Sequence, residues 1–152
     1  MKRPSEGELR EKIVFHAASL FQRGYAPGTS GNISVRLDDG ILVTPAKACM
    51  GYLEPANLAV IDFSGRLISG GKPSKEAILH LKLYEARPQA NAIVHLHSTY
   101  AVAVSCLEEN DLNDALPPLT PYYVMKIGTL PVVPYYPPGD IALAGTVANL
   151  AS

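Results

Sequence analysis

Two histidines separated by one residue are the part of this sequence best suited to chemistry. His95 and His97 follow the apolar residues Ala92 to Val94, whose composition favours a buried strand. Side chains alternate along a strand, so the two imidazoles would project from the same face. Neighbouring imidazoles can share one divalent metal ion. The spacing alone leaves open a second interpretation, two buried histidines that are each satisfied by a hydrogen bond.

The segments around the histidine pair predict its place in the fold. Thr99 to Cys106 has the pattern of a helix, with the hydroxyl of Ser98 as its cap. The pair would therefore lie at the C-terminal end of a strand, where α/β sheets often carry their active sites.

A candidate carboxylate precedes the pair. Ser74 is expected to cap a helix that ends at Arg87, with Lys75 and Glu76 in its first turn. An acid there usually reflects the helix dipole, but a carboxylate that faces a cleft can act as metal ligand or general base. Lys75 is either a solvated charge or a contact for an anion beside the helix amides.

A glycine-rich loop, Gly28 to Asn32, is the candidate anion cradle. Composition alone favours an ordinary turn into the next strand over a phosphate site. The remaining pattern predicts alternating strands and helices. The expected strands are 33–37, 41–44, 58–63, 66–68, 122–127 and 130–133. The other expected helices are one that a capping box of Ser5 and Glu8 starts and Gly24 ends, and one at 141–151.

Composition excludes several classes of function. The 152 residues include 47% hydrophobic and 18% charged residues, which is typical of a globular domain. A formal net charge of -1 gives no basic excess for binding nucleic acid or a membrane surface. Two cysteines, Cys49 and Cys106, are too few for a disulfide scaffold, and no apolar run would cross a bilayer. We therefore expect a cytoplasmic protein.

Three segments in order, Gly28 to Ser34, Lys72 to Glu76 and His95 to His97, together resemble the class II aldolase/adducin family. The resemblance runs through nearly the whole chain. Lys75 stands where the sugar-phosphate aldolases tend to have a serine. This lysine and the stretch Pro117 to Asp140 are most similar to the 3-oxo-tetronate 4-phosphate decarboxylase branch.

The resemblance implies a fold and an assembly. We expect one α/β domain over residues 1–152, in three α/β/α layers with a mostly antiparallel central sheet. Members of the family commonly form tetramers with active sites at subunit interfaces, so a homotetramer is expected.

The resemblance also assigns the metal site and the catalytic groups. His95 and His97 match ligands of zinc or a similar divalent metal ion. Glu76 matches an acid/base residue that can also approach the metal. Tyr122 matches a catalytic tyrosine of the aldolases, with Tyr123 as the alternative register.

Substrate-binding residues follow from the same comparison. Asn32, Ser74 and Lys75 match positions of the family's phosphate site. Thr44 opens a segment, Thr44 to Lys47, that stands where relatives often have Thr-Pro-Thr-Gly, and Lys47 would supply positive charge there.

These residues imply a metal-dependent carbon–carbon lyase. It would decarboxylate a 3-oxo-tetronate 4-phosphate to dihydroxyacetone phosphate and CO2, through an enediolate whose charge the metal stabilises. A class II sugar-phosphate aldolase of the fuculose-phosphate type or a pentulose-phosphate 4-epimerase could use the same site. The alternative outside the enzymes is a non-catalytic domain, either adducin-like or truncated.

The end of the sequence bears on this last alternative. The final expected helix reaches Ser152 without a stop signal, so we expect that a C-terminal part is missing. The family's third metal-binding histidine would lie there. His16 and His80, on predicted helices, are poor substitutes, so weak zinc binding is expected of this chain.

Overall fold

An antiparallel sheet of five strands, in the order β4-β3-β2-β1-β5, forms the centre of the computed structural model, which describes residues 4–108 and 111–152. The strands are β1 (Asn32–Arg36), β2 (Gly40–Val43), β3 (Ala59–Asp62), β4 (Leu67–Ser69) and β5 (Ala92–His95). The α-helices are α1 (Glu6–Gln22), α2 (Ala77–Ala86), α3 (Thr99–Ser105), α4 (Pro121–Lys126) and α5 (Ile141–Ala151). Two short 3-10 helices, η1 (Met50–Tyr52) and η2 (Pro55–Asn57), connect β2 to β3.

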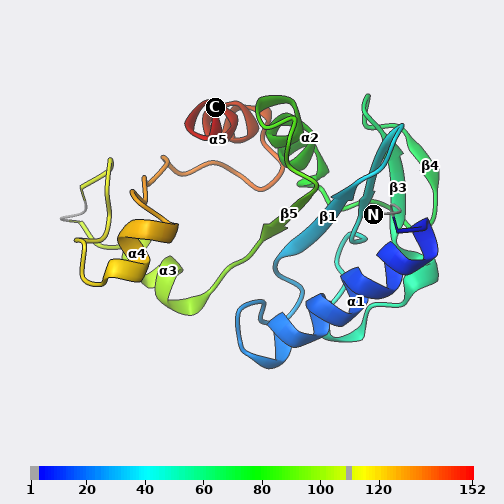
Figure 1. Cartoon of the computed structure of the whole chain (residues 1–152), viewed down its shortest axis with the longest axis horizontal. Coiled ribbons are helices and arrows are strands. Elements are labelled where there is room, and N and C mark those ends of the chain that lie inside the picture. The colour runs from blue at the N-terminus through cyan, green and yellow to red at the C-terminus, as the bar shows by residue number, and fades with distance from the viewer. Residues whose placement is uncertain (1–3, 109–110) are drawn as a thin grey trace.

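Helices cover both faces of this sheet. Figure 1 shows α1 along one face, and α2 with α5 beside it on the other. The predicted three-layer α/β/α architecture with an antiparallel sheet is therefore confirmed.

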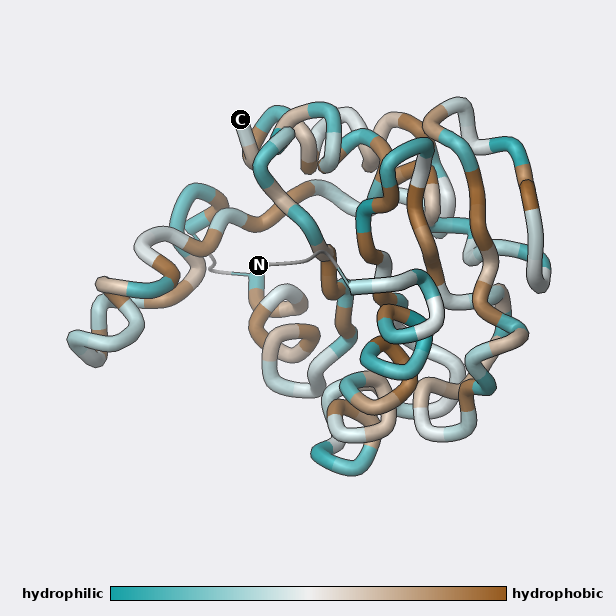
Figure 2. The backbone as a smooth tube through the Cα atoms, turned by 45° about the vertical axis from the view of Figure 1, so that its right-hand side comes forward, coloured by the Kyte–Doolittle hydropathy of each residue, from teal (hydrophilic) through white to brown (hydrophobic). Residues whose placement is uncertain are grey.

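Alternation along β2 supplies a hydrophobic core to each layer. Leu42 packs in the cluster that contains Ile13 and Ala17 of α1. Its neighbours Ile41 and Val43 point the other way and join the cluster beneath α2. Figure 2 shows hydrophobic residues running along the strands of the sheet. Burial on both faces fixes the register of β2, because a slip by one residue would exchange the two cores.

The face of β1 that meets α2 is polar. Asn32 and Ser34 are buried there at 3% and 0% exposure, whereas Ile33 between them joins the core on the α1 side. The antiparallel register pairs Asn32 with His95 of β5. Directly opposed residues project from the same face with their Cβ atoms about 5 Å apart. The sheet therefore brings an amide and an imidazole together beneath the start of α2.

The start of α2 differs slightly from the prediction. Glu76 is the N-cap residue and the helix begins at Ala77, so Lys75 and Glu76 lie in the preceding turn. The hydroxyl of Ser74 accepts a hydrogen bond from the backbone N–H of Glu76 at 3.3 Å. This contact holds the turn whose end carries the Glu76 side chain.

Three expectations about strands are wrong. β5 is an edge strand of the described sheet, with Val94 51% exposed, and not a buried one. The segment 122–127 belongs to helix α4, because Thr120 caps the backbone N–H of Tyr123 and Pro121 occupies the first turn. The segment 130–133 forms no strand, and three of its backbone groups bond instead to the loop at 112–115.

The segment between β5 and α5 projects away from the sheet (Figure 1). It carries α3 and α4 and exposes large apolar side chains, among them Tyr100, Tyr122, Met125 and Tyr135. In the described parts of the chain, every helix is too short or too polar to span a membrane.

Candidate active site

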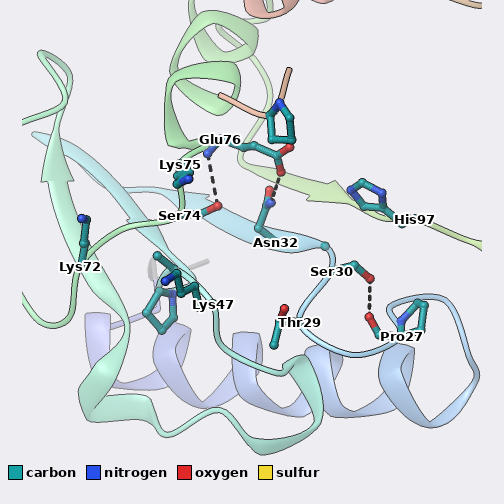
Figure 3. A pocket seen from close by; sticks show the side chains of 14 residues that line it. Pro27, Thr29, Ser30, Asn32, Lys47, Lys72, Ser74, Lys75, Glu76 and His97 are labelled. Carbon is teal, nitrogen blue, oxygen red and sulfur yellow. Dashed lines mark hydrogen bonds between the residues drawn. The ribbon is translucent and has the colours of Figure 1, made fainter. Parts of the chain in front are cut away.

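A cavity of about 630 Å³ opens where α2 begins, beside the loop before β1. This volume is that of a small-molecule site. Its lining residues come from five separate segments of the chain, and Figure 3 shows their side chains around it. The polar residues of its wall are Thr29, Ser30, Asn32, Lys47, Lys72, Ser74, Lys75, Glu76 and His97.

Three of the predicted chemical groups come together, and two of them, Glu76 and His97, line this cavity. Glu76, His95 and His97 each place a ligand atom within 4.8 Å of the others. Glu76 lies at the N-cap of α2. His95 is the last residue of β5, and His97 follows two residues later. The rings of His95 and His97 have their centroids 4.8 Å apart. The group combines two neutral nitrogen ligands with one carboxylate, a set typical of catalytic zinc sites.

The environment of His95 fits a bound cation. Its Nδ1 lies 2.9 Å from Oε2 of Glu76, which is the distance of an ion pair. This nitrogen is nevertheless buried and makes no hydrogen bond, so the two atoms are close but not aligned. Buried polar atoms without a partner are rare and call for an explanation. A divalent ion shared by the ring nitrogen and the carboxylate would satisfy both.

Glu76 is held as a carboxylate. Its pKa is lowered to about 2, chiefly because the His95 ring lies against it, with smaller contributions from the hydrogen bond of Asn32 and the charge of His97. The Asn32 amide Nδ2 donates to Oε2 of Glu76 at 2.6 Å. Burial and the neighbouring His95 lower the pKa of His97, which favours the neutral ring that a metal requires.

Gly31 allows the loop before β1 to approach the end of β5. Its φ is +78°, a conformation that other residues rarely adopt. A Cβ atom there would lie 3.0 Å from both the backbone oxygen of His95 and Sδ of Met50. The glycine therefore lets Asn32 enter β1 directly opposite His95.

The rest of the cavity is cationic. Lys47, Lys72 and Lys75 all line it, together with the hydroxyl groups of Thr29 and Ser74. In Figure 3 the three lysines lie around the side of the cavity away from His97. Among the described residues, Lys47 is the one residue other than glycine with a positive φ, +59°. Several ammonium groups near one carboxylate favour a ligand with more than one negative charge.

The predicted substrate-binding residues are mostly brought together. Asn32, Ser74 and Lys75 line the cavity. Thr44 does not: it is 2% exposed, and its hydroxyl accepts a hydrogen bond from the backbone N–H of Ile33 at 3.2 Å. In this structure Thr44 closes the β1–β2 pairing instead of facing the cavity.

Tyr122, the predicted catalytic tyrosine, lies elsewhere. It belongs to α4 in the projecting segment, is 79% exposed and is absent from the described wall of the cavity. Within one chain the structure therefore does not unite Tyr122 with Glu76.

Sequence reasoning did not identify a set of buried polar residues behind the site. His80 and Tyr84 of α2 meet Ser34 of β1, and all three are buried. Their signal is regular spacing: Glu76, His80 and Tyr84 repeat every four residues, which places them on one face of a helix. Lys72, to which the sequence analysis gave no role of its own, is also a residue of the cavity wall.

The sequence matches the family described as Class II Aldolase and Adducin N-terminal domain over residues 11–152, and the chain belongs to this family. The 3-oxo-tetronate 4-phosphate decarboxylase of Pectobacterium atrosepticum is 53% identical over 97% of this chain and 68% of its own length. The enzyme of the same name from Cupriavidus necator is 51% identical, over 97% of this chain and 68% of its own length.

Solved structures agree with this assignment. YgbL from Escherichia coli superposes with a TM-score of 0.92 at 46% identity, over 97% of this chain and 72% of that chain. L-fuculose-1-phosphate aldolase from Thermus thermophilus gives 0.79 at 28% identity, over 93% and 69%.

Proposed function

We propose that this chain is a metal-dependent carboxy-lyase that converts 3-oxo-tetronate 4-phosphate to dihydroxyacetone phosphate and CO2. The observation that carries the proposal is the group of Glu76, His95 and His97 beside a cavity with three lysines. About 50% identity to enzymes named for this reaction selects it among the activities of the family.

The cavity suits a substrate with an anion at each end. We place the phosphate against Ser74 and the lysines, with Lys75 and the backbone of the turn before α2 as donors. The carbon that carries the carboxylate then lies towards Glu76 and the histidines. Such fixation aligns the bond that breaks, which lowers the barrier without any change in chemistry.

His95 and His97 would hold a divalent ion, and we propose zinc because imidazole and carboxylate ligands suit it. When bound, the ion supplies Lewis-acid stabilisation of the negative charge that remains after CO2 departs. Asn32 keeps the Glu76 carboxylate turned towards this position through its 2.6 Å hydrogen bond.

Glu76 moves the proton. Its low pKa means that it begins as a carboxylate. Repulsion by the negatively charged substrate favours the protonated form of this carboxyl, and water supplies the proton that Glu76 takes up. Glu76 then delivers this proton to the carbon that lost CO2, and the product leaves as a ketone.

Tyr122 has a place in this proposal only if chains associate. We propose a homotetramer in which the exposed apolar projecting segment packs on a neighbouring chain and Tyr122 serves that chain's site. Mixing inactive Glu76→Gln chains with inactive Tyr122→Phe chains should then restore part of the activity. No restoration, with assembly verified by light scattering, would contradict a shared site.

A class II aldolase is the second candidate. This chain has the possible metal ligands Glu76, His95 and His97, and its fold is similar to that of an L-fuculose-1-phosphate aldolase. The test offers purified, metal-loaded protein the 3-oxo-tetronate 4-phosphate, a fuculose phosphate and a pentulose phosphate in parallel. Release of CO2 with dihydroxyacetone phosphate supports the decarboxylase. Cleavage of the fuculose phosphate alone would identify an aldolase instead, and epimerisation of the pentulose phosphate alone would identify an epimerase. No turnover of any substrate would favour a non-catalytic domain.

Glu76→Gln is the matched control for this substrate test, because it keeps the size of the side chain and removes its proton transfer.

We also propose that the enzyme works in the cytoplasm, since both cysteines are free and phosphorylated metabolites are retained inside cells. Fractionation of the native cells would test this.

A further inference from the structure

A continuous row of hydrogen bonds runs from Glu76 into the core between α2 and the sheet. Beyond the contact between Asn32 and Glu76, Oδ1 of Asn32 meets Nε2 of His80 at 2.5 Å. On the other side of that ring, Nδ1 meets the hydroxyl of Ser34 at 2.6 Å. The Ser34 hydroxyl meets the Tyr84 hydroxyl at 3.0 Å. His80 and Ser34 are both 0% exposed, so no solvent interrupts the row.

The chemistry of the groups fixes the direction of each bond. Nδ2 of Asn32 donates to Oε2 of Glu76, so the oxygen of the same amide faces the other way. The Asn32 oxygen then faces His80 and only accepts, so the proton of the ring must be on Nε2. Complete burial of the ring disfavours its charged form.

The far side of the ring follows by the same logic. In a neutral ring with its proton on Nε2, the Nδ1 atom accepts, and Ser34 donates to it. The Ser34 oxygen remains free to accept from the Tyr84 hydroxyl. Every donor in the row then points towards a neighbour that can accept from it.

We propose that His80 is a positioning residue, which sets the orientation of the Asn32 amide and through it aims the Glu76 carboxylate. This rests on the proposed role of Glu76 in proton transfer. If Asn32 were turned over, its oxygen would face the carboxylate at 2.6 Å and repel it, and its nitrogen would face the N–H of His80. A ring that donates from Nε2 excludes this arrangement.

Two substitutions separate the two sides of the ring. In His80→Gln, the amide nitrogen is as many bonds from the backbone as Nε2, so donation to Asn32 survives. In His80→Asn, the amide oxygen replaces Nδ1, so acceptance from Ser34 survives and donation to Asn32 is lost. Both variants place a smaller polar side chain in the same buried site, which makes each the control for the other.

We expect His80→Asn to lower kcat by about 10- to 100-fold, the range usual for loss of an orienting contact. His80→Gln should retain kcat within about fivefold of the wild type, although both variants lower the unfolding midpoint to a similar degree. A merely structural role would lower activity equally in both, and equal kcat values would overturn the proposal.

A measurement on the wild-type protein does not depend on turnover. Nitrogen chemical shifts of His80, read by NMR in protein without substrate, distinguish a ring with its proton on Nε2 from one with it on Nδ1. The Nε2–H form is expected, and the Nδ1–H form would refute the proposal even in an active enzyme. If the wild type shows the Nε2–H form but no decarboxylation, the proposed reaction fails while the orientation of Asn32 stands.

Discussion

Lys47 combines backbone strain with a charge at the cavity, and two substitutions separate these effects. Its φ of +59° lies in the left-handed region, where a side chain costs about 1–2 kcal/mol relative to glycine. Lys47→Gly relieves this cost but loses about 0.5–1 kcal/mol through the greater freedom of the unfolded chain. Lys47→Ala keeps the strain. We expect the glycine variant to be more stable than the alanine variant by about 0.5–1 kcal/mol.

The two variants should behave alike towards the substrate. The ammonium group lines the cavity but is exposed, so its attraction for a phosphate is worth about 1 kcal/mol, which is about fivefold in KM. Both should raise KM by that factor with little change in kcat, and the effect should shrink as salt is added.

The assay pairs urea unfolding with steady-state kinetics of the decarboxylation. Lys12→Ala serves as the control, because Lys12 is an exposed lysine of α1 outside this cavity. Equal stability of the glycine and alanine variants would refute the argument from strain. A KM that neither substitution changes, or that changes as much in Lys12→Ala, would refute the argument from charge.

Three further predictions concern Glu76, the two histidines, and Gly31 in the loop beside them. The pKa of Glu76 is lowered to about 2, so the contribution of this carboxylate to the free energy of unfolding is complete above pH 4.5. This contribution falls by about 2 kcal/mol between pH 5 and pH 3. Urea unfolding of Glu76→Gln should lack this loss. His95→Ala and His97→Ala should each weaken zinc binding at least tenfold in calorimetry, and unchanged affinity would exclude them as ligands. Gly31→Ala should lower the unfolding free energy by about 1–3 kcal/mol, measured by thermal melting.

Local sequence signals predicted most of the sheet and the helices around it. The hairpin of β1 and β2 follows from apolar alternation around Asp39 and Gly40, and both α1 and α5 begin at a side-chain cap. These signals depend on neighbours along the chain, so a single sequence displays them.

Signals that depended on composition alone failed in the projecting segment. Tyr122 to Ile127 is rich in residues that favour strands, yet Thr120 and Pro121 start a helix there. Propensity is a weak guide where few neighbours pack against a segment, and here the local cap decides the structure.

The candidate site was predictable in its chemistry and not in its details. The resemblance to the class II aldolase/adducin family assigned Glu76, His95 and His97 to one metal site, whereas the spacing of the histidines alone left their role open. The contact of Asn32 with both Glu76 and His80 depends on the pairing of β1 with β5, and a register between distant strands leaves no local mark in the sequence.

The position of His95 relative to Asn32 and Glu76 depends on the register of β5 against β1. A slip of β5 by one residue would turn His95 towards α1, and a slip by two would keep the face but move it about 7 Å from Asn32. β5 has one bonded neighbour in the described sheet, so this alignment depends on a single ladder of hydrogen bonds. We therefore expect amide hydrogen exchange in β5 to be faster than in β2, and an ion bound to its last residue to slow it.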